Sequence, residues 1–140
     1  MTRSKRRARV NAFAKELDIG TPEGSRQVWA APVSGRPPLL VARRERWVAI
    51  RMARELILIR PRRRRPFARD DIVTRLPYDH AEVRRVRWVG PLRQVVVEDT
   101  AAAPESDAQA YALEFALRDR RFAKGLVAAV ESTPTTAGAR

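Results

Sequence analysis

The sequence predicts a mainly β fold with a helix near each end, and three observations support this prediction. Short apolar runs rich in valine and isoleucine alternate with turn-forming glycine and proline, as expected for antiparallel strands. Two further stretches, one near each terminus, repeat apolar residues every three to four positions, as amphipathic helices do. The chain has 140 residues, of which 44% are hydrophobic, so one domain with its own core is expected.

The N-terminal 26 residues predict a basic arm and a short helix. Arginine and lysine dominate the first nine residues, a composition typical of an arm that stays mobile until it meets a partner. The apolar residues of segment 10–17 then fall at i, i+3, i+4 and i+7 on one helical face, and Gly20 follows at a suitable stop. Residues 21–26 contain proline and glycine, which predicts a loop before a first strand around Val28 and Val33.

The segment from residue 39 to residue 60 admits two interpretations. One joins Arg43–Leu58 into a single basic helix, but its apolar residues do not keep to one stripe. The other is a series of strands, with a turn at Ala53 and Arg54 and a buried last strand that runs into Pro61. We favour this second interpretation. Its strands are Leu39–Ala42, Trp47–Met52 and Leu56–Ile59.

The pattern is clearer in the second half of the chain. Strands are predicted at Ile72–Leu76, Val83–Val89, Leu92–Glu98 and Tyr111–Phe115. The connections between them are a turn at 77–80, a hairpin turn at Gly90-Pro91 and a polar loop over Asp99–Asp107. Phe122, Leu126 and Val130 recur every four residues and predict a closing helix. The small and polar residues 132–140 predict a disordered tail.

Three segments carry a resemblance to a known fold: residues 47–61 (WVAIRMARELILIRP), residues 76–86 (LPYDHAEVRRV), and residues 111–115 with the closing helix. They are similar to the opening hairpin, the strand-turn-strand middle and the end of the pleckstrin-homology superfold, in particular its small bacterial PH-like and GRAM-like members. The resemblance implies a PH-like barrel of two antiparallel sheets capped by the C-terminal helix, with a role in binding rather than in chemistry.

The resemblance also suggests how the chain is divided. Residues 1–26 form the basic arm and short helix, residues 27–131 the PH-like domain, and residues 132–140 the disordered tail. Phosphoinositide-binding members of the superfold carry a basic cluster at the first hairpin, and its nearest counterparts here are Arg51, Arg60 and Arg62. The spacing departs from that pattern, because the densest charge of this chain follows the hairpin.

Composition narrows the kind of partner. The chain has 29 basic and 16 acidic residues, a formal net charge of +13, and a pI of about 11.6, which suits an anionic partner. The absence of cysteine excludes disulfides and thiolate metal sites and fits a reducing compartment, so a cytoplasmic location is expected. No run of about 18 apolar residues predicts a transmembrane segment, although a peripheral membrane role stays open.

Four consecutive arginines between Pro61 and Pro66 are the strongest binding signal. Like charges in succession repel one another, and the flanking prolines stiffen the ends of the loop, so an anion is expected to stabilise the arrangement. Arginine also grips phosphate and carboxylate bidentately. Arginines interleaved in the later hairpin offer a basic stripe that extends the same site. The predicted anion-binding residues are Arg60, Arg62, Arg63, Arg64, Arg65, Arg69, Arg84, Arg85 and Arg87.

No pattern in the chain predicts catalysis. There is no glycine-rich phosphate loop, nucleophile elbow or HExxH motif, so we expect neither an enzyme nor a cofactor. His80 is the only histidine and is predicted to lie in a surface turn without a metal. The pairs Asp70-Asp71 and Glu98-Asp99 are interpreted as partners of nearby arginines. The three tryptophans lie in apolar strand segments, which favours packing in the core or at an interface over stacking with bases.

Two functional hypotheses follow from these residues. In the first, the protein is a binding module that docks on an anionic surface, either a membrane or an acidic protein, through Arg62–Arg65, helped by Arg60, Arg69 and the N-terminal arm. In the second, it is a nucleic-acid or ribosome-associated protein whose arginines neutralise backbone phosphates without reading bases.

Overall fold

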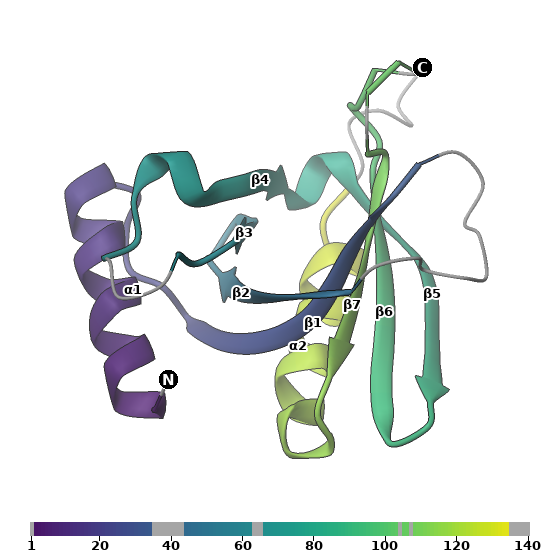
Figure 1. The fold of residues 1–140 in the computed structure, drawn as a ribbon. Coiled ribbons are helices and arrows are strands. Elements are labelled where there is room, and N and C mark those ends of the chain that lie inside the picture. The colour runs from purple at the N-terminus through teal and green to yellow at the C-terminus, as the bar shows by residue number, and fades with distance from the viewer. Residues whose placement is uncertain (1, 35–43, 63–65, 104, 107, 135–140) are drawn as a thin grey trace.

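The described strands form one antiparallel sheet, and a helix lies at each end of the chain (Figure 1). This computed structural model describes residues 2–34, 44–62, 66–103, 105–106 and 108–134. The strands are β1 (Gly24–Val33), β2 (Glu45–Arg51), β3 (Glu55–Ile59), β4 (Ile72–Pro77), β5 (Ala81–Val89), β6 (Leu92–Asp99) and β7 (Ala110–Phe115). The helices are α1 (Arg3–Leu17) and α2 (Arg120–Glu131), with short 3-10 turns η1 (Arg69–Asp71), η2 (Tyr78–His80) and η3 (Leu117–Asp119).

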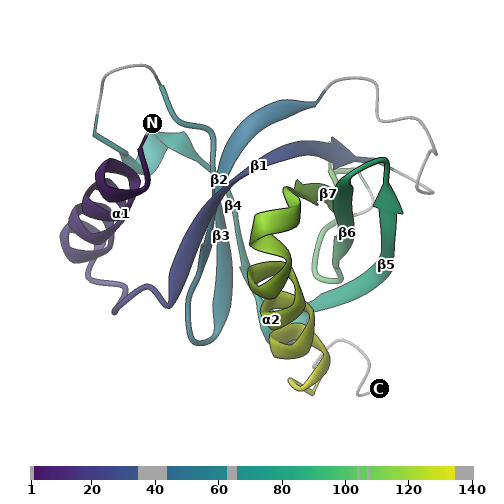
Figure 2. The same cartoon turned by 90° about the horizontal axis from the view of Figure 1, so that it is seen from below.

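Strand β1 joins the two halves of the sheet. The spatial order is β4-β3-β2-β1-β7-β6-β5, so β1 lies at the centre. Residues 24–30 of β1 pair with β2, whereas residues 29–33 pair with β7. The prediction of two separate sheets is therefore wrong: one sheet of seven strands curls into a half-barrel (Figure 2). With ten residues, β1 is long enough to pair with β2 along one part and with β7 along the other. The twist of the strands curves the sheet.

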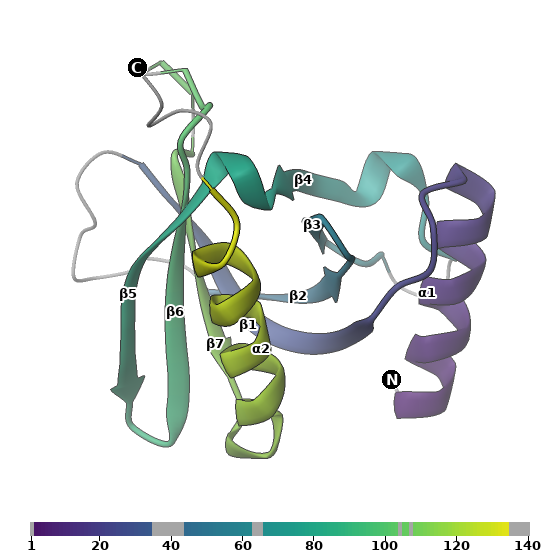
Figure 3. The same ribbon diagram turned by 180° about the vertical axis from the view of Figure 1, so that it is seen from behind.

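The concave side of the sheet holds the main core, which α2 covers (Figure 3). The predicted stripe of Phe122, Leu126 and Val130 is buried and faces this core, as its four-residue spacing indicates. Trp47 and Leu113 from the sheet belong to the same cluster. The prediction of a closing amphipathic helix is confirmed.

The N-terminal segment is a helix almost from its start, so the prediction of a mobile basic arm over the first nine residues is wrong. Helix α1 begins at Arg3, where the Thr2 hydroxyl accepts a hydrogen bond from the Lys5 amide at 3.2 Å. It ends at Leu17, because Asp18 takes a left-handed conformation with φ 52°. Its buried face packs on the sheet through Phe13 and its neighbours. Packing supplies the order that a highly charged helix of this length lacks by itself.

Helix α1 explains why the apolar residues of β2 and β3 do not alternate with polar ones. Trp47 and Leu58 face the core beneath α2, whereas Ile50 and Ile57 face the second cluster beneath α1. Both faces of this hairpin are therefore buried, so its sequence shows a continuous apolar run in place of alternation. The strand interpretation is confirmed for β2 and β3, and the single helix over Arg43–Leu58 is wrong.

The remaining local predictions divide into three groups. The β5–β6 hairpin turns at Gly90, whose φ of 58° suits glycine, and the turn before β5 forms η2, so both predictions are confirmed. Strand β1 begins at Gly24, inside the loop predicted for residues 21–26. The predicted strand Leu39–Ala42 and residues 135–140 of the predicted tail lie outside the described residues.

A buried tyrosine makes the stability of this fold sensitive to alkaline pH. Tyr78 donates a hydrogen bond to the Met52 carbonyl at 2.7 Å, and its burial raises the pKa of the phenol. Above the unfolded-state value of about 10 the unfolded chain loses this proton while the folded chain keeps it, so stability falls as pH rises. We expect a slope of about 1.4 kcal/mol per pH unit from this group.

Urea unfolding between pH 8 and pH 11 measures this effect. Tyr78→Phe lacks the ionisable group, and it also leaves the Met52 carbonyl without its partner, which costs about 1–3 kcal/mol at every pH. The difference in stability between the wild type and the variant should therefore shrink above pH 10. A difference that stays constant over the whole range would contradict the assignment.

Candidate functional site

The described part of the predicted arginine loop is already paired with carboxylates. Arg60 Nε lies 2.8 Å from Glu45 Oε2, and Arg62 Nε lies 3.1 Å from Asp71 Oδ1. Asp71 is buried, and its other carboxylate oxygen accepts a hydrogen bond from the Ala68 amide at 3.0 Å. This part of the loop is thus held in place by internal ion pairs. Arg63, Arg64 and Arg65 lie outside the described residues.

The arginines of β5 lie far from this loop. Arg85 and Arg87 share one face of the strand, as predicted, and Arg87 Nε donates to Gln94 Oε1 at 2.8 Å. Arg84 is paired with Glu98 across the hairpin. Strand β5 is the edge of the sheet away from α1, and the loop before β4 lies beside α1, as both views show (Figures 1 and 2). The hypothesis that the hairpin arginines extend the loop site is therefore wrong.

Helix α1 carries further basic residues and contacts Phe67, which follows the loop. Lys5, Arg9 and Phe13 are spaced four residues apart and follow one stripe of the helix. At the end of this stripe, the ring of Phe13 meets the ring of Phe67 edge-on, with centroids 6.4 Å apart. We call Lys5 and Arg9, together with Arg60, Arg62 and Arg69, the basic face.

The basic residues of α1 differ from those of the loop in their partners. Within the part of the chain that the structure describes, Lys5 and Arg9 form no ion pair, and the helix contains one acidic residue, Glu16. Arg69, also predicted for the site, is exposed in η1. Part of the charge available to an external anion therefore lies on α1, the segment predicted to be a mobile arm, and another part lies on Arg118, Arg120, Arg121 and Lys124.

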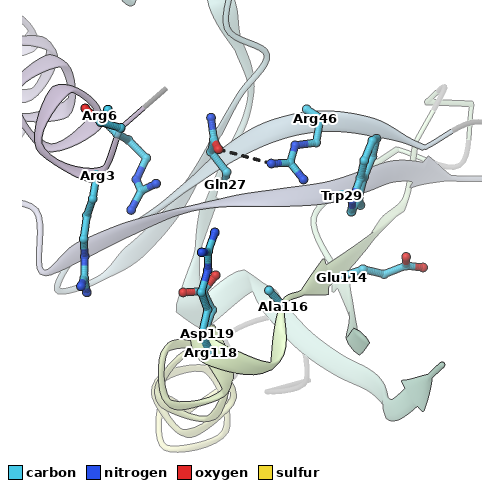
Figure 4. Close-up of a pocket in the computed structure, with 10 residues that line it drawn as sticks. Arg3, Arg6, Gln27, Trp29, Arg46, Glu114, Ala116, Arg118 and Asp119 are labelled. Carbon is cyan, nitrogen blue, oxygen red and sulfur yellow. Dashed lines mark hydrogen bonds between the residues drawn. The ribbon is translucent and has the colours of Figure 1, made fainter. Parts of the chain in front are cut away.

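A second cationic feature is a pocket of about 390 Å³ between the start of α1, β1, β2 and η3 (Figure 4). Its lining includes Arg3, Arg6, Gln27, Trp29, Arg46 and Arg118. We call it the Arg6 pocket. It was not predicted, although the signal was present: Arg6 precedes Val10 by one four-residue step on the buried face of α1.

The tryptophans divide between core and surface. Trp47 is fully buried, as predicted, but Trp29 and Trp88 are 37% and 52% exposed. Each exposed ring is covered by an arginine: Arg46 lies 4.8 Å from the centroid of Trp29, and Arg93 lies 5.0 Å from that of Trp88. Packing in the core is therefore wrong for these two rings, and packing at an interface stays a prediction for them.

Two of the carboxylates singled out in the sequence form ion pairs with arginines. Asp71 pairs with Arg62 and Glu98 with Arg84, which confirms that they serve as partners of arginines. Over the described ranges, no group of three or more acidic or histidine side chains is placed to hold a metal ion. Among the same residues, no helix has the length and apolar character needed to cross a bilayer.

The curled antiparallel sheet and the C-terminal helix on its concave face define a pleckstrin-homology-like fold. The sequence matches no known protein-family profile and no curated protein. Solved structures of the Vav1 exchange factor are similar in fold. One, described for the structural role of the PH and C1 domains of Vav1, has a TM-score of 0.54 at 14% identity over 82% of this chain.

Two further Vav1 structures agree with this comparison. The apo activated truncation has a TM-score of 0.57 at 14% identity, and the form bound to an allosteric inhibitor has 0.58 at 12%, each over 92% of this chain. The chain spans 27% to 33% of the length of these Vav1 chains. At this level of identity the likeness establishes the fold and nothing finer.

Proposed function

We propose that this protein is a non-enzymatic binding module that docks through its basic face on an anionic membrane surface. The observation that carries the proposal is the position of Lys5 and Arg9, which are free of carboxylate partners among the described residues and lie on the stripe of α1 that leads to the arginine loop. Arg63, Arg64 and Arg65 belong to the same loop and add to its charge. A cluster of four to eight basic residues suits a bilayer rich in anionic lipid.

A membrane is favoured over a nucleic acid because of the aromatic residues. Stacking with unpaired bases needs free ring faces among basic side chains. Both exposed tryptophans already carry an arginine over the ring, and Trp88 lies on β5, away from α1. Contact with backbone phosphates alone remains the alternative, and it has a different signature, a steep dependence of binding on salt.

Sedimentation with vesicles tests the docking proposal. Each basic residue near an anionic bilayer contributes about 1 kcal/mol, so Lys5→Ser combined with Arg9→Ser should weaken binding to phosphatidylserine vesicles by about 30-fold. Arg121→Ser combined with Lys124→Ser is the matched control, because it removes the same charge from exposed positions of α2. The control should bind within about threefold of the wild type, since its charges lie off the basic face.

The loop is tested separately with Arg63→Ser, Arg64→Ser and Arg65→Ser in one chain. Arg62 is kept, because its removal would leave the buried Asp71 without its ion-pair partner.

Equal losses of vesicle binding from the α1 and α2 variants would contradict the assignment of the basic face. Binding to generic RNA with a steep salt dependence, without vesicle binding, would replace the membrane by nucleic acid.

A further inference from the structure

Arg6 is a buried arginine whose Nε has no hydrogen-bond partner. Its side chain lies on the face of α1 that carries Val10 and Phe13, and it is 8% exposed. The Nε atom is buried, yet no described group accepts its proton. A buried N–H donor without an acceptor is unfavourable, because it gives up its hydrogen bond to water and forms none in the protein.

The charged groups around Arg6 make its burial still less favourable. Burial lowers the pKa of Arg6, the nearby Arg26 lowers it further, and Asp119 acts in the opposite direction. The Asp119 carboxylate is engaged elsewhere, since it accepts a hydrogen bond from Arg26 Nε at 2.9 Å. An arginine stays protonated in proteins, so the charge is retained in the pocket and is not lost by titration.

The Arg6 pocket supplies the space that an anion needs. Arg6 from α1 and Arg46 from β2 extend toward Gln27 from opposite sides in Figure 4. Thr2 at the N-terminus of α1 also lines the pocket, and the positive end of the helix dipole favours an anion there. Gln27 accepts from Arg46 at 3.3 Å through its carbonyl oxygen, so its amide group remains available as a donor.

The lining charges indicate a dianion. Four arginines line the pocket, Arg3, Arg6, Arg46 and Arg118, against two carboxylates, Glu114 and Asp119, so four positive and two negative charges leave +2. Both carboxylates are already satisfied, Asp119 by Arg26, and Glu114 by Arg44 and Gln94. A phosphate monoester carries nearly two charges at neutral pH and several acceptor oxygens, whereas a carboxylate carries one charge.

We propose that the Arg6 pocket binds the phosphomonoester group of a phosphorylated ligand, with Arg6 as its central contact. The site differs from the basic face in its residues, because neither Lys5 nor Arg9 lines the pocket, which takes Arg6 from α1 and further residues from β1, β2 and η3. In this site the Arg6 guanidinium donates to a phosphate oxygen, and the exposed Arg118 lines the pocket from η3.

Thermal unfolding with soluble phosphate tests the site independently of vesicle docking. Inorganic phosphate and glycerol 3-phosphate should each raise the Tm of the wild type in a saturable way, relative to sodium chloride of equal ionic strength. Arg6→Met keeps the length of the side chain and removes the unpaired charge. It should leave the Tm without phosphate unchanged or higher, and weaken the apparent affinity for phosphate about 10- to 100-fold.

Two further variants make the test decisive. Arg9→Met is the matched control on the same helix and should keep the full response to phosphate. Arg118→Gln alters an exposed lining residue without disturbing the core, so it should weaken phosphate about tenfold even if Arg6→Met fails to fold, whereas Arg120→Gln should not. The proposal is overturned if the wild type responds equally to phosphate and chloride, or if both lining variants keep the response.

A second experiment distinguishes a soluble phosphomonoester from a lipid headgroup as the ligand. If Arg6→Met loses the response to glycerol 3-phosphate but keeps any preference of the wild type for phosphatidic acid over phosphatidylserine vesicles, the ligand is a soluble phosphomonoester. If it loses both, the site takes a lipid headgroup. Either result supports the Arg6 pocket, and neither depends on the variants of Lys5 and Arg9.

Discussion

Trp47→Ala is expected to lower the free energy of unfolding by about 3–5 kcal/mol, a large share of the roughly 5–15 kcal/mol that stabilises a domain of this size. The side chain is fully buried in the core beneath α2. Its ring lies 6.2 Å from that of Tyr111, and the Arg60 guanidinium lies 5.7 Å from its centroid. The substitution leaves a cavity that the paired strands β1 and β2 cannot close, because their hydrogen bonds fix their spacing.

Trp29→Ala is the matched control, since it removes the same side chain from the partly exposed surface of β1. It should lower the free energy of unfolding by about 1 kcal/mol or less, the loss of the contact with Arg46 and some half-buried area. Guanidinium chloride unfolding measures both variants. Similar costs for the two substitutions would show that Trp47 does not occupy the core as described.

The contrast between these tryptophans shows what sequence patterns can predict. All three occur in apolar strand segments, so composition alone assigned them to packing, and this was right for Trp47. Alternation along a strand predicts which residues share a face, but not which face is covered. Trp88 lies on an edge strand, where it lines a pocket beside α2 and still remains 52% exposed, and Trp29 is 37% exposed on β1.

The elements with the clearest patterns were predicted well, and the connection between them was not. The hairpin at Gly90 and helix α2 follow from local signals, namely a turn residue and a four-residue apolar spacing. The single sheet depends on β1 pairing with both β2 and β7, and this pairing between segments far apart in the chain has no local signature. Two sheets were therefore expected where there is one.

The sequence predicts the charge of the candidate site but not the arrangement of its side chains. The arginine run is visible in the sequence, yet the partners of Arg60 and Arg62 come from β2 and from η1, and only the fold brings them into contact. The Arg6 pocket escaped prediction for a different reason. An arginine within a basic segment is assumed to face solvent, whereas the apolar face of α1 extends to Arg6 and places it against β1.

The last prediction concerns the attachment of α1, on which both proposed sites depend. Phe13 is buried between α1 and the sheet and contacts Phe67 of the arginine loop. Phe13→Ala should cost about 3–5 kcal/mol, and the loss should be local, because the core beneath α2 contains no residue of α1. Hydrogen exchange should therefore accelerate in α1 and in segment 66–71 before it does in β6 and β7.

Ala12→Gly separates the attachment of the helix from its intrinsic stability. Ala12 is exposed, so glycine there weakens the helix by about 1 kcal/mol without touching the contact with the sheet. Phe13→Ala should remove the response to phosphate although Phe13 does not line the Arg6 pocket, whereas Ala12→Gly should keep it. Uniform acceleration of exchange across the whole sheet in Phe13→Ala would mean that α1 and the sheet unfold as one unit. In that case the attachment of α1 would be part of the fold itself, and its basic residues could not be released from the sheet without unfolding the domain.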